Sequence, residues 1–146
     1  MHLNLTHTLL AATAVLALSV VPAFAQEVKF SADLTAAAEV PPTDSTATGK
    51  VDATLDSTSK MLTWTISYEG LTGEAMAAHF HGPAAMDANA PPVVPIEGAL
   101  TSPISGSATL TDEQITQLQG GQWYFNVHTA KFPDGEIRGQ VVAAAM

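Results

Sequence analysis

The segment Val28-Lys29-Phe30-Ser31-Ala32-Asp33-Leu34 decides the fold class, because apolar and polar residues alternate along it without a break. Successive side chains of a β-strand point to opposite faces of the sheet, so this alternation predicts a strand with one apolar face. The strand is expected to end before Glu39-Val40-Pro41-Pro42, since proline has no N–H to donate to a neighbouring strand.

The same two-residue period continues along the chain and predicts six further strands. They are expected at residues 51–55, 62–68, 76–81, 105–110, 123–128 and 137–141. Their apolar positions, together with Phe30, give the expected core: Leu55, Leu62, Trp64, Ile66, Phe80, Trp123, Phe125, Val127, Ile137 and Val141. Met76 is in phase with Phe80 and is expected to point inward as well.

Two segments interrupt the strand pattern. Residues 84–103 are rich in proline and have little periodicity, which indicates a long loop or a pair of short edge strands. Thr111 followed by Gln114 is typical of a capping box, so a short helix is expected to begin there and to end at Gly120-Gly121. Seven strands and one helical connection predict an all-β fold, a single Greek-key β-sandwich or barrel with one short helix.

The composition excludes several classes of function. The chain has 146 residues, with 14 acidic side chains against 5 basic ones and a net charge of −9. The few cations are scattered, so nucleic acid is not an expected partner. There is no cysteine, which excludes disulfides, thiolate metal sites and thiol nucleophiles. No serine lies in a Gly-x-Ser-x-Gly elbow, and no catalytic residue is predicted.

Residues 1–25 are expected to be a signal peptide. An apolar run from Leu9 to Val21 precedes Ala23-Phe24-Ala25, which matches an A-x-A cleavage signal. Cleavage after Ala25 leaves one domain, residues 26–146, in a secreted or periplasmic protein with no stable membrane insertion. An uncleaved anchor is the alternative, because His2 and His7 stand where Lys or Arg is usual.

Three histidines follow the expected leader, and they are the candidates for a metal site. His79 and His81 are two residues apart on one strand, so they project from the same face, and His128 is in phase on another strand. If the two strands pair, three imidazoles converge on one ion. All three are expected on the outward face, under the proline-rich loop. Imidazole ligands without thiolate suit copper(II) or zinc, and the Irving–Williams order favours copper.

Glu136 and Arg138 are predicted on the same outward class of positions, shortly after His128. The carboxylate of Glu136 is a candidate fourth ligand or an acceptor for an imidazole N–H, and Arg138 is a candidate guide for an anion. The alternative for the histidines is a solvated group with no metal, since a His-x-His pair alone is a weak signal.

Several sequence blocks resemble the CHRD domain, the module first described in chordin. They include Ala78-His79-Phe80-His81-Gly82-Pro83-Ala84, Asn126-Val127-His128-Thr129 and Gly135-Glu136-Ile137-Arg138-Gly139. The resemblance implies an exported β-rich module, whose relative in chordin lies among growth-factor-binding domains. The chain is more distantly similar to copper/zinc superoxide dismutase, a Greek-key barrel that carries copper on a strand His-x-His. It lacks the cysteines and the zinc-ligand loop of that enzyme, which argues against a dinuclear site and leaves dismutase activity unsupported.

Two classes of function follow from the sequence. The first is a copper-binding or zinc-binding protein of the cell envelope, with His79, His81 and His128 as ligands, acting in metal handling or redox protection. The second is an interaction or structural module of the envelope with no metal and no catalysis. The protein partner of such a module is unknown.

Overall fold

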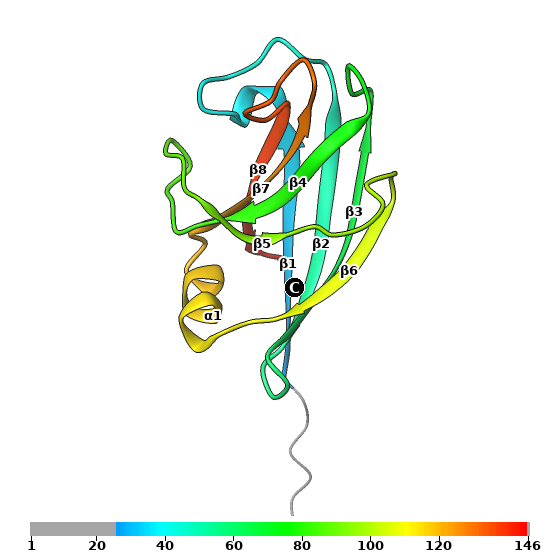
Figure 1. Ribbon diagram of the computed structural model, residues 1–146. Helices are drawn as coiled ribbons and strands as arrows, with labels where there is room; N and C mark the ends of the chain where they lie inside the picture. The colour runs from blue at the N-terminus through cyan, green and yellow to red at the C-terminus, as the bar shows by residue number, and fades with distance from the viewer. Residues whose placement is uncertain (1–25, 146) are drawn as a thin grey trace, which may run out of the picture.

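The computed structural model describes residues 26–145, which form an antiparallel β-fold with one short α-helix (Figure 1). The strands are β1 (Glu27–Thr35), β2 (Thr48–Asp56), β3 (Met61–Glu69), β4 (Ala75–His81), β5 (Pro92–Pro95), β6 (Ile104–Thr109), β7 (Trp123–Thr129) and β8 (Ile137–Ala143). The helices are the 3-10 turn η1 (Ala36–Ala38) and α1 (Asp112–Gln119). The predicted fold class is confirmed, and β5 is the strand added to the seven expected.

The strands form a single sheet in the order β5-β4-β7-β8-β1-β2-β3-β6. β1, β2 and β3 form a meander. The register of β1 with β2 is unbroken from Glu27↔Asp56 to Thr35↔Thr48, and that of β2 with β3 from Thr48↔Glu69 to Asp56↔Met61. The sheet curves on itself into a nearly closed barrel, and β5 and β6 are its two edge strands (Figure 1). One face of each strand therefore points into a shared core, and the other faces outward.

The core contains every residue that the two-residue period assigns to it, apart from Met76. The least buried of the predicted set is Trp64, at 7% exposed, and most of the others are fully buried. Phe80 lies at the centre, with its ring centroid 5.3 Å from Trp64 and 4.8 Å from Phe125. Burial of each such side chain contributes about 1.5–3 kcal/mol, so the core stabilises both strands that carry histidines.

Met76 was expected inside, and this prediction is wrong, since the side chain is 66% exposed. The register between β4 and β7 shifts between Ala75 and Ala77, as it does at a β-bulge. An extra residue in one strand reverses the faces on one side of the bulge. Ala75 packs against the core instead, while Ala78 and Phe80 keep the predicted inward direction.

The connections follow the predicted pattern. Residues 84–103 contain the short edge strand β5 within a longer loop. The helix α1 begins with the expected capping box, in which Gln114 N donates to Thr111 Oγ1 at 3.2 Å and Thr111 N donates to Gln114 Oε1 at 2.9 Å. Leu118 is the one fully buried residue of this helix.

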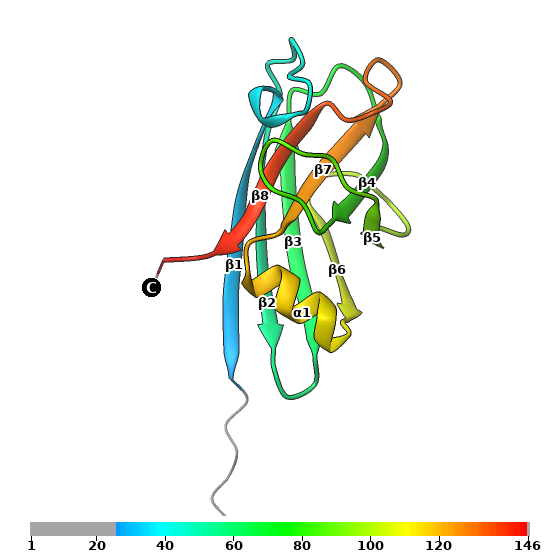
Figure 2. The same cartoon turned by 90° about the vertical axis from the view of Figure 1, so that its left-hand side faces the viewer.

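The loop between β4 and β5, residues 82–91, crosses the outer side of β7 and β8 (Figure 2). This loop covers part of the outward face on which the histidines were predicted. Within residues 26–145 no helix has the length and apolar character needed to cross a membrane. The predicted signal peptide, residues 1–25, lies outside the described residues.

Candidate metal centre

The two strands that carry the histidines are neighbours. β4 supplies His79 and His81, and β7 supplies His128, with Ala77 opposite His128 and His79 opposite Asn126. Because side chains alternate along both strands, the three imidazoles project from the same outer face. One ring nitrogen from each lies within 4.8 Å of those of the other two. The structure thus brings together the three residues that the sequence selected.

Backbone carbonyls fix the tautomers of two imidazoles. Nδ1 of His81 lies 2.9 Å from Ala90 O, and Nδ1 of His128 lies 2.9 Å from Pro133 O. A carbonyl oxygen only accepts, so each Nδ1 carries the hydrogen and donates it. In the neutral ring the other nitrogen, Nε2, then presents a lone pair. Such carbonyl contacts are how ligating histidines are commonly oriented in metal sites.

The two Nε2 lone pairs have different surroundings. Nε2 of His128 lies 3.1 Å from Nδ1 of His79, which donates to it in the neutral site. Nε2 of His81 is buried and has no hydrogen-bond partner in the described part of the chain. A metal ion at about 2.0–2.1 Å from each nitrogen would satisfy both lone pairs, with the nitrogens about 3.4 Å apart. For Nδ1 of His79 to act as a ligand, its hydrogen would first have to move to Nε2.

The surroundings of His79 and His81 favour the neutral form of both imidazoles. Burial lowers the pKa of His79 below its ordinary value, and the neighbouring His128 and His81 lower it further. Burial also lowers the pKa of His81, against the opposing effects of its bond to Ala90 and of the neighbouring Asn126 side chain. Because only an imidazole with a free lone pair coordinates a metal, these lowered pKa values favour the form of His79 and His81 that could act as a ligand.

Arg138 lies behind the histidines rather than beside them. It was expected to face outward, yet it is 1% exposed, because residues 82–91 cover it. Its guanidinium donates to Asn89 Oδ1 at 2.9 Å and to Ala88 O at 2.8 Å, with longer bonds to two other carbonyls of the loop. The same group lies over the ring of Tyr124, 3.5 Å from its centroid, and the other face of that ring meets His81.

Glu136 is also buried, although it was expected to face outward, and the structure does not bring it into the histidine group. Its carboxylate accepts bonds from Ser45 Oγ at 2.6 Å, Thr129 Oγ1 at 2.6 Å and both Oγ1 and N of Thr72, at 2.8 and 2.9 Å. Burial raises the pKa of this carboxyl, but these hydrogen bonds outweigh burial and leave the pKa below its ordinary value. Glu136 therefore ties the two loops that contain Ser45 and Thr72 to β7 as a buried anion.

Three further residues of this face were missed as functional candidates: Glu39, Tyr124 and Asn126. Glu39 is 5% exposed, and burial raises its pKa to about 7, against the opposing charge of Arg138. Tyr124 and Asn126 alternate with the core residues of β7 and share their face with His128. The two-residue period of this strand could therefore have identified Tyr124 and Asn126 as neighbours of His128 on the outer face. For Glu39 the sequence contains no such periodic signal, because this residue lies in the Glu-Val-Pro-Pro segment that follows the first strand.

Comparison with known protein families gives one match, to the CHRD domain, over residues 30–141. The matched range contains all three histidines and both Glu136 and Arg138. No curated protein and no solved structure gives a significant match to the chain.

Proposed function

The chain belongs to the CHRD domain family, and we propose that it binds one copper ion, with zinc as the alternative, through His79, His81 and His128. One observation carries this proposal. One ring nitrogen of each of the three imidazoles lies within 4.8 Å of the other two, and Nε2 of His81, the most buried of the three residues, has no hydrogen-bond partner among the described residues. A buried lone pair without a partner is unfavourable, and a metal ion removes that cost.

The donor set favours copper over harder cations. All three ligands are imidazoles, and Glu136, the candidate carboxylate, is fully engaged with Ser45, Thr72 and Thr129. Magnesium and calcium prefer oxygen ligands, whereas copper(II) and zinc accept nitrogen, with copper ahead in affinity. When bound, such an ion supplies Lewis acidity and, in the case of copper, one-electron redox chemistry.

The protein's own groups prepare the site. Ala90 O and Pro133 O orient two rings, and the packed stack of Tyr124 and Arg138 supports His81 from behind. His79 and His128 are only half-buried, so the ion would be reached from the solvent side. Three protein ligands leave a coordination position open to water or a small anion.

We further propose that the protein acts outside the cytoplasm. Residues 1–25 carry the features of a cleavable leader, and cleavage would leave a mature chain that starts at Gln26. A cysteine-free domain with an imidazole site then suits metal handling or redox protection in the cell envelope. An interaction module without metal is the competing function, and the experiment below separates the two.

The test uses untagged protein starting at Gln26, prepared without chelator. Metal analysis should find close to one copper or zinc ion per chain. The electron paramagnetic resonance spectrum of the copper(II) form should show hyperfine coupling to nitrogen. His128→Ala should lose the ion, whereas Met86→Leu, a change at an exposed residue of the covering loop, should retain it. Wild-type protein that takes up neither metal would identify the interaction module.

A further inference from the structure

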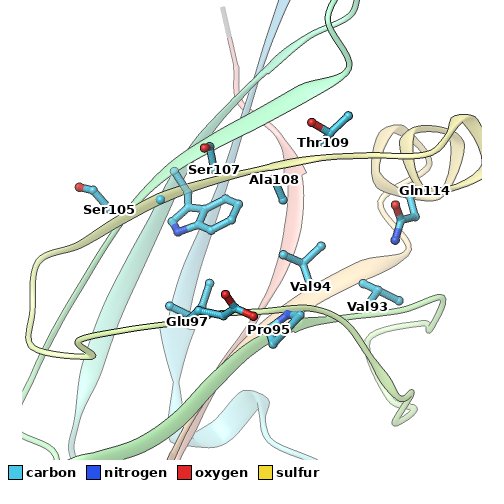
Figure 3. A pocket seen from close by; sticks show the side chains of 12 residues that line it. Val93, Val94, Pro95, Glu97, Ser105, Ser107, Ala108, Thr109 and Gln114 are labelled. Atoms are coloured by element: carbon cyan, nitrogen blue, oxygen red, sulfur yellow. The ribbon is translucent and has the colours of Figure 1, made fainter.

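The barrel has one open seam, between β5 and β6. Within residues 26–145, β5 pairs only with β4, and β6 pairs only with β3. A cleft of about 360 Å³ lies along this seam. Figure 3 shows Val93, Val94 and Pro95 along one side of the cleft and Ser107, Ala108 and Thr109 along the other. A cleft of this size is within the range of ligand sites.

The cleft exists because the inward residues of β6 are small. Gly106 is opposite Trp64 and Ala108 is opposite Leu62 in the register with β3. A Cβ atom on Gly106 would lie 2.8 Å from the ring of Trp64, so the indole occupies the space that a side chain would fill. Trp64 thus lines the cleft while 7% exposed, and its Nε1 has no acceptor within the described chain.

The direction of the β6 backbone groups follows from one hydrogen bond. Leu110 N donates to Lys60 O at 2.9 Å, which continues the register of β6 with β3. In an antiparallel ladder, alternate residues bond to the partner strand, so Gly106 and Ala108 bond to β3. The N–H and C=O groups of Ser105, Ser107 and Thr109 point the other way, to the open seam.

The two edges of the seam are not equivalent. Ile96 N donates to Ala78 O at 3.0 Å, so Val94 and Ile96 bond to β4 while Val93 and Pro95 face the seam. Proline has no N–H, and it is a common device that protects a strand edge from pairing. The sequence of β6, Ile-Ser-Gly-Ser-Ala-Thr, contains neither proline nor charge. β6 is therefore an unprotected edge with three free N–H groups.

We propose that this seam binds an extended, cationic segment of a partner protein, which adds to β6 as a further strand. Its backbone would pair with the seam-facing groups of Ser105, Ser107 and Thr109. Small apolar side chains of the segment would fill the cleft beside Gly106 and Ala108. This binding is separate from the metal proposal and uses none of the histidines.

Charge decides which partner fits. Glu97 is the one charged residue among those that line the cleft, and no lysine or arginine lines it in residues 26–145. The whole chain has a net charge of −9. Two copies paired edge to edge would repel each other, whereas lysine or arginine in the bound segment would be attracted to Glu97.

The probe is a short synthetic peptide with lysine at both ends and alternating valine and threonine between them. It is titrated into ¹⁵N-labelled protein and followed by NMR. The amide signals of Ser105, Ser107 and Thr109 and the indole signal of Trp64 should shift together. Ser107→Pro removes one seam-facing N–H without removing a bond to β3, and it should weaken binding about tenfold or more. Ser107→Ala, the matched control, should bind like the wild type.

One further arm completes the test. The same peptide with glutamate ends should bind more weakly than the lysine form. The proposal is overturned if β6 signals do not respond to the lysine peptide, or if Ser107→Pro binds as tightly as Ser107→Ala. It is also overturned if β6 signals shift with protein concentration alone, since that result would identify a second copy as the occupant.

Discussion

The phenol ring of Tyr124 lies flat against the imidazole of His81, with ring centroids 4.7 Å apart and planes inclined by 4°. Tyr124 Oη also donates to Ala90 O at 3.1 Å, the same carbonyl that accepts from Nδ1 of His81. Ring plane and tautomer of His81 are thus fixed by one neighbouring side chain and one carbonyl. If His81 is a metal ligand as proposed, this arrangement preorganises it and lowers the entropic cost of binding an ion.

Replacing Tyr124 should therefore weaken metal binding. We expect Tyr124→Leu, which removes the stacked ring, to reduce the affinity for copper(II) about tenfold, in line with losses at residues that orient metal ligands. Tyr124→Phe keeps the stack and loses only the two bonds of the hydroxyl, which donates to Ala90 O and accepts from Ala90 N, so its loss of affinity should be smaller. Competition titration against a copper chelator measures both. Equal affinity of Tyr124→Leu and wild type would show that the stack does not orient His81.

Arg138→Lys should loosen the loop that covers the site. The guanidinium holds Asn89 and three loop carbonyls with one planar group, and a lysine ammonium cannot reproduce this geometry. We expect the variant to be cleaved faster by protease within residues 82–91 and to bind copper less tightly, although its charge is unchanged. Limited proteolysis followed by mass analysis locates the cut. Wild-type resistance in this loop would argue against Arg138 as its anchor.

The two buried carboxylates should respond oppositely to loss of charge in metal-free protein. Burial raises the pKa of Glu39 from 4.5 to about 7, so between these values the folded state holds a proton that the unfolded state has released. Stability is then lost as pH rises through this window, and above pH 7 the whole cost remains. Glu39→Gln should stabilise the protein by about 2 kcal/mol at pH 8 and have little effect at pH 4.

Glu136→Gln is the matched comparison. The pKa of Glu136 is lowered, so its ionised form contributes stability that is present above pH 4.5 and is lost as pH falls through the folded value. We expect the variant to lose about 2 kcal/mol at pH 8, because the amide cannot accept all the hydrogen bonds of the carboxylate. Copper affinity should be unchanged. Denaturant unfolding at pH 4 and pH 8 measures the stability of both variants. A change in stability of the same sign for both variants at pH 8 would contradict this account of the carboxylates.

Most of the barrel and the three histidines could be predicted from the sequence, because both depend on a local two-residue period. Phe80 and His79 sit on opposite faces for that reason alone. Met76 was misplaced because a bulge depends on how β4 pairs with β7, which the period of one strand does not contain. Arg138 in β8 and Glu136 just before β8 were predicted to face outward, but loops cover both side chains and bury them. Their burial depends on loops whose path no periodicity records.

The most direct test of the metal site is the melting temperature of metal-free protein with and without stoichiometric copper(II) or zinc at neutral pH. In the folded chain the ligand nitrogens lie within 4.8 Å, whereas His81 and His128 are far apart in the unfolded chain. An ion at a hundred times its dissociation constant then adds about 2.7 kcal/mol, a rise of several degrees. The rise should fade below about pH 6, where protons compete for imidazole, and should vanish in His128→Ala. A wild-type melting temperature unchanged by either metal would contradict the three-histidine site.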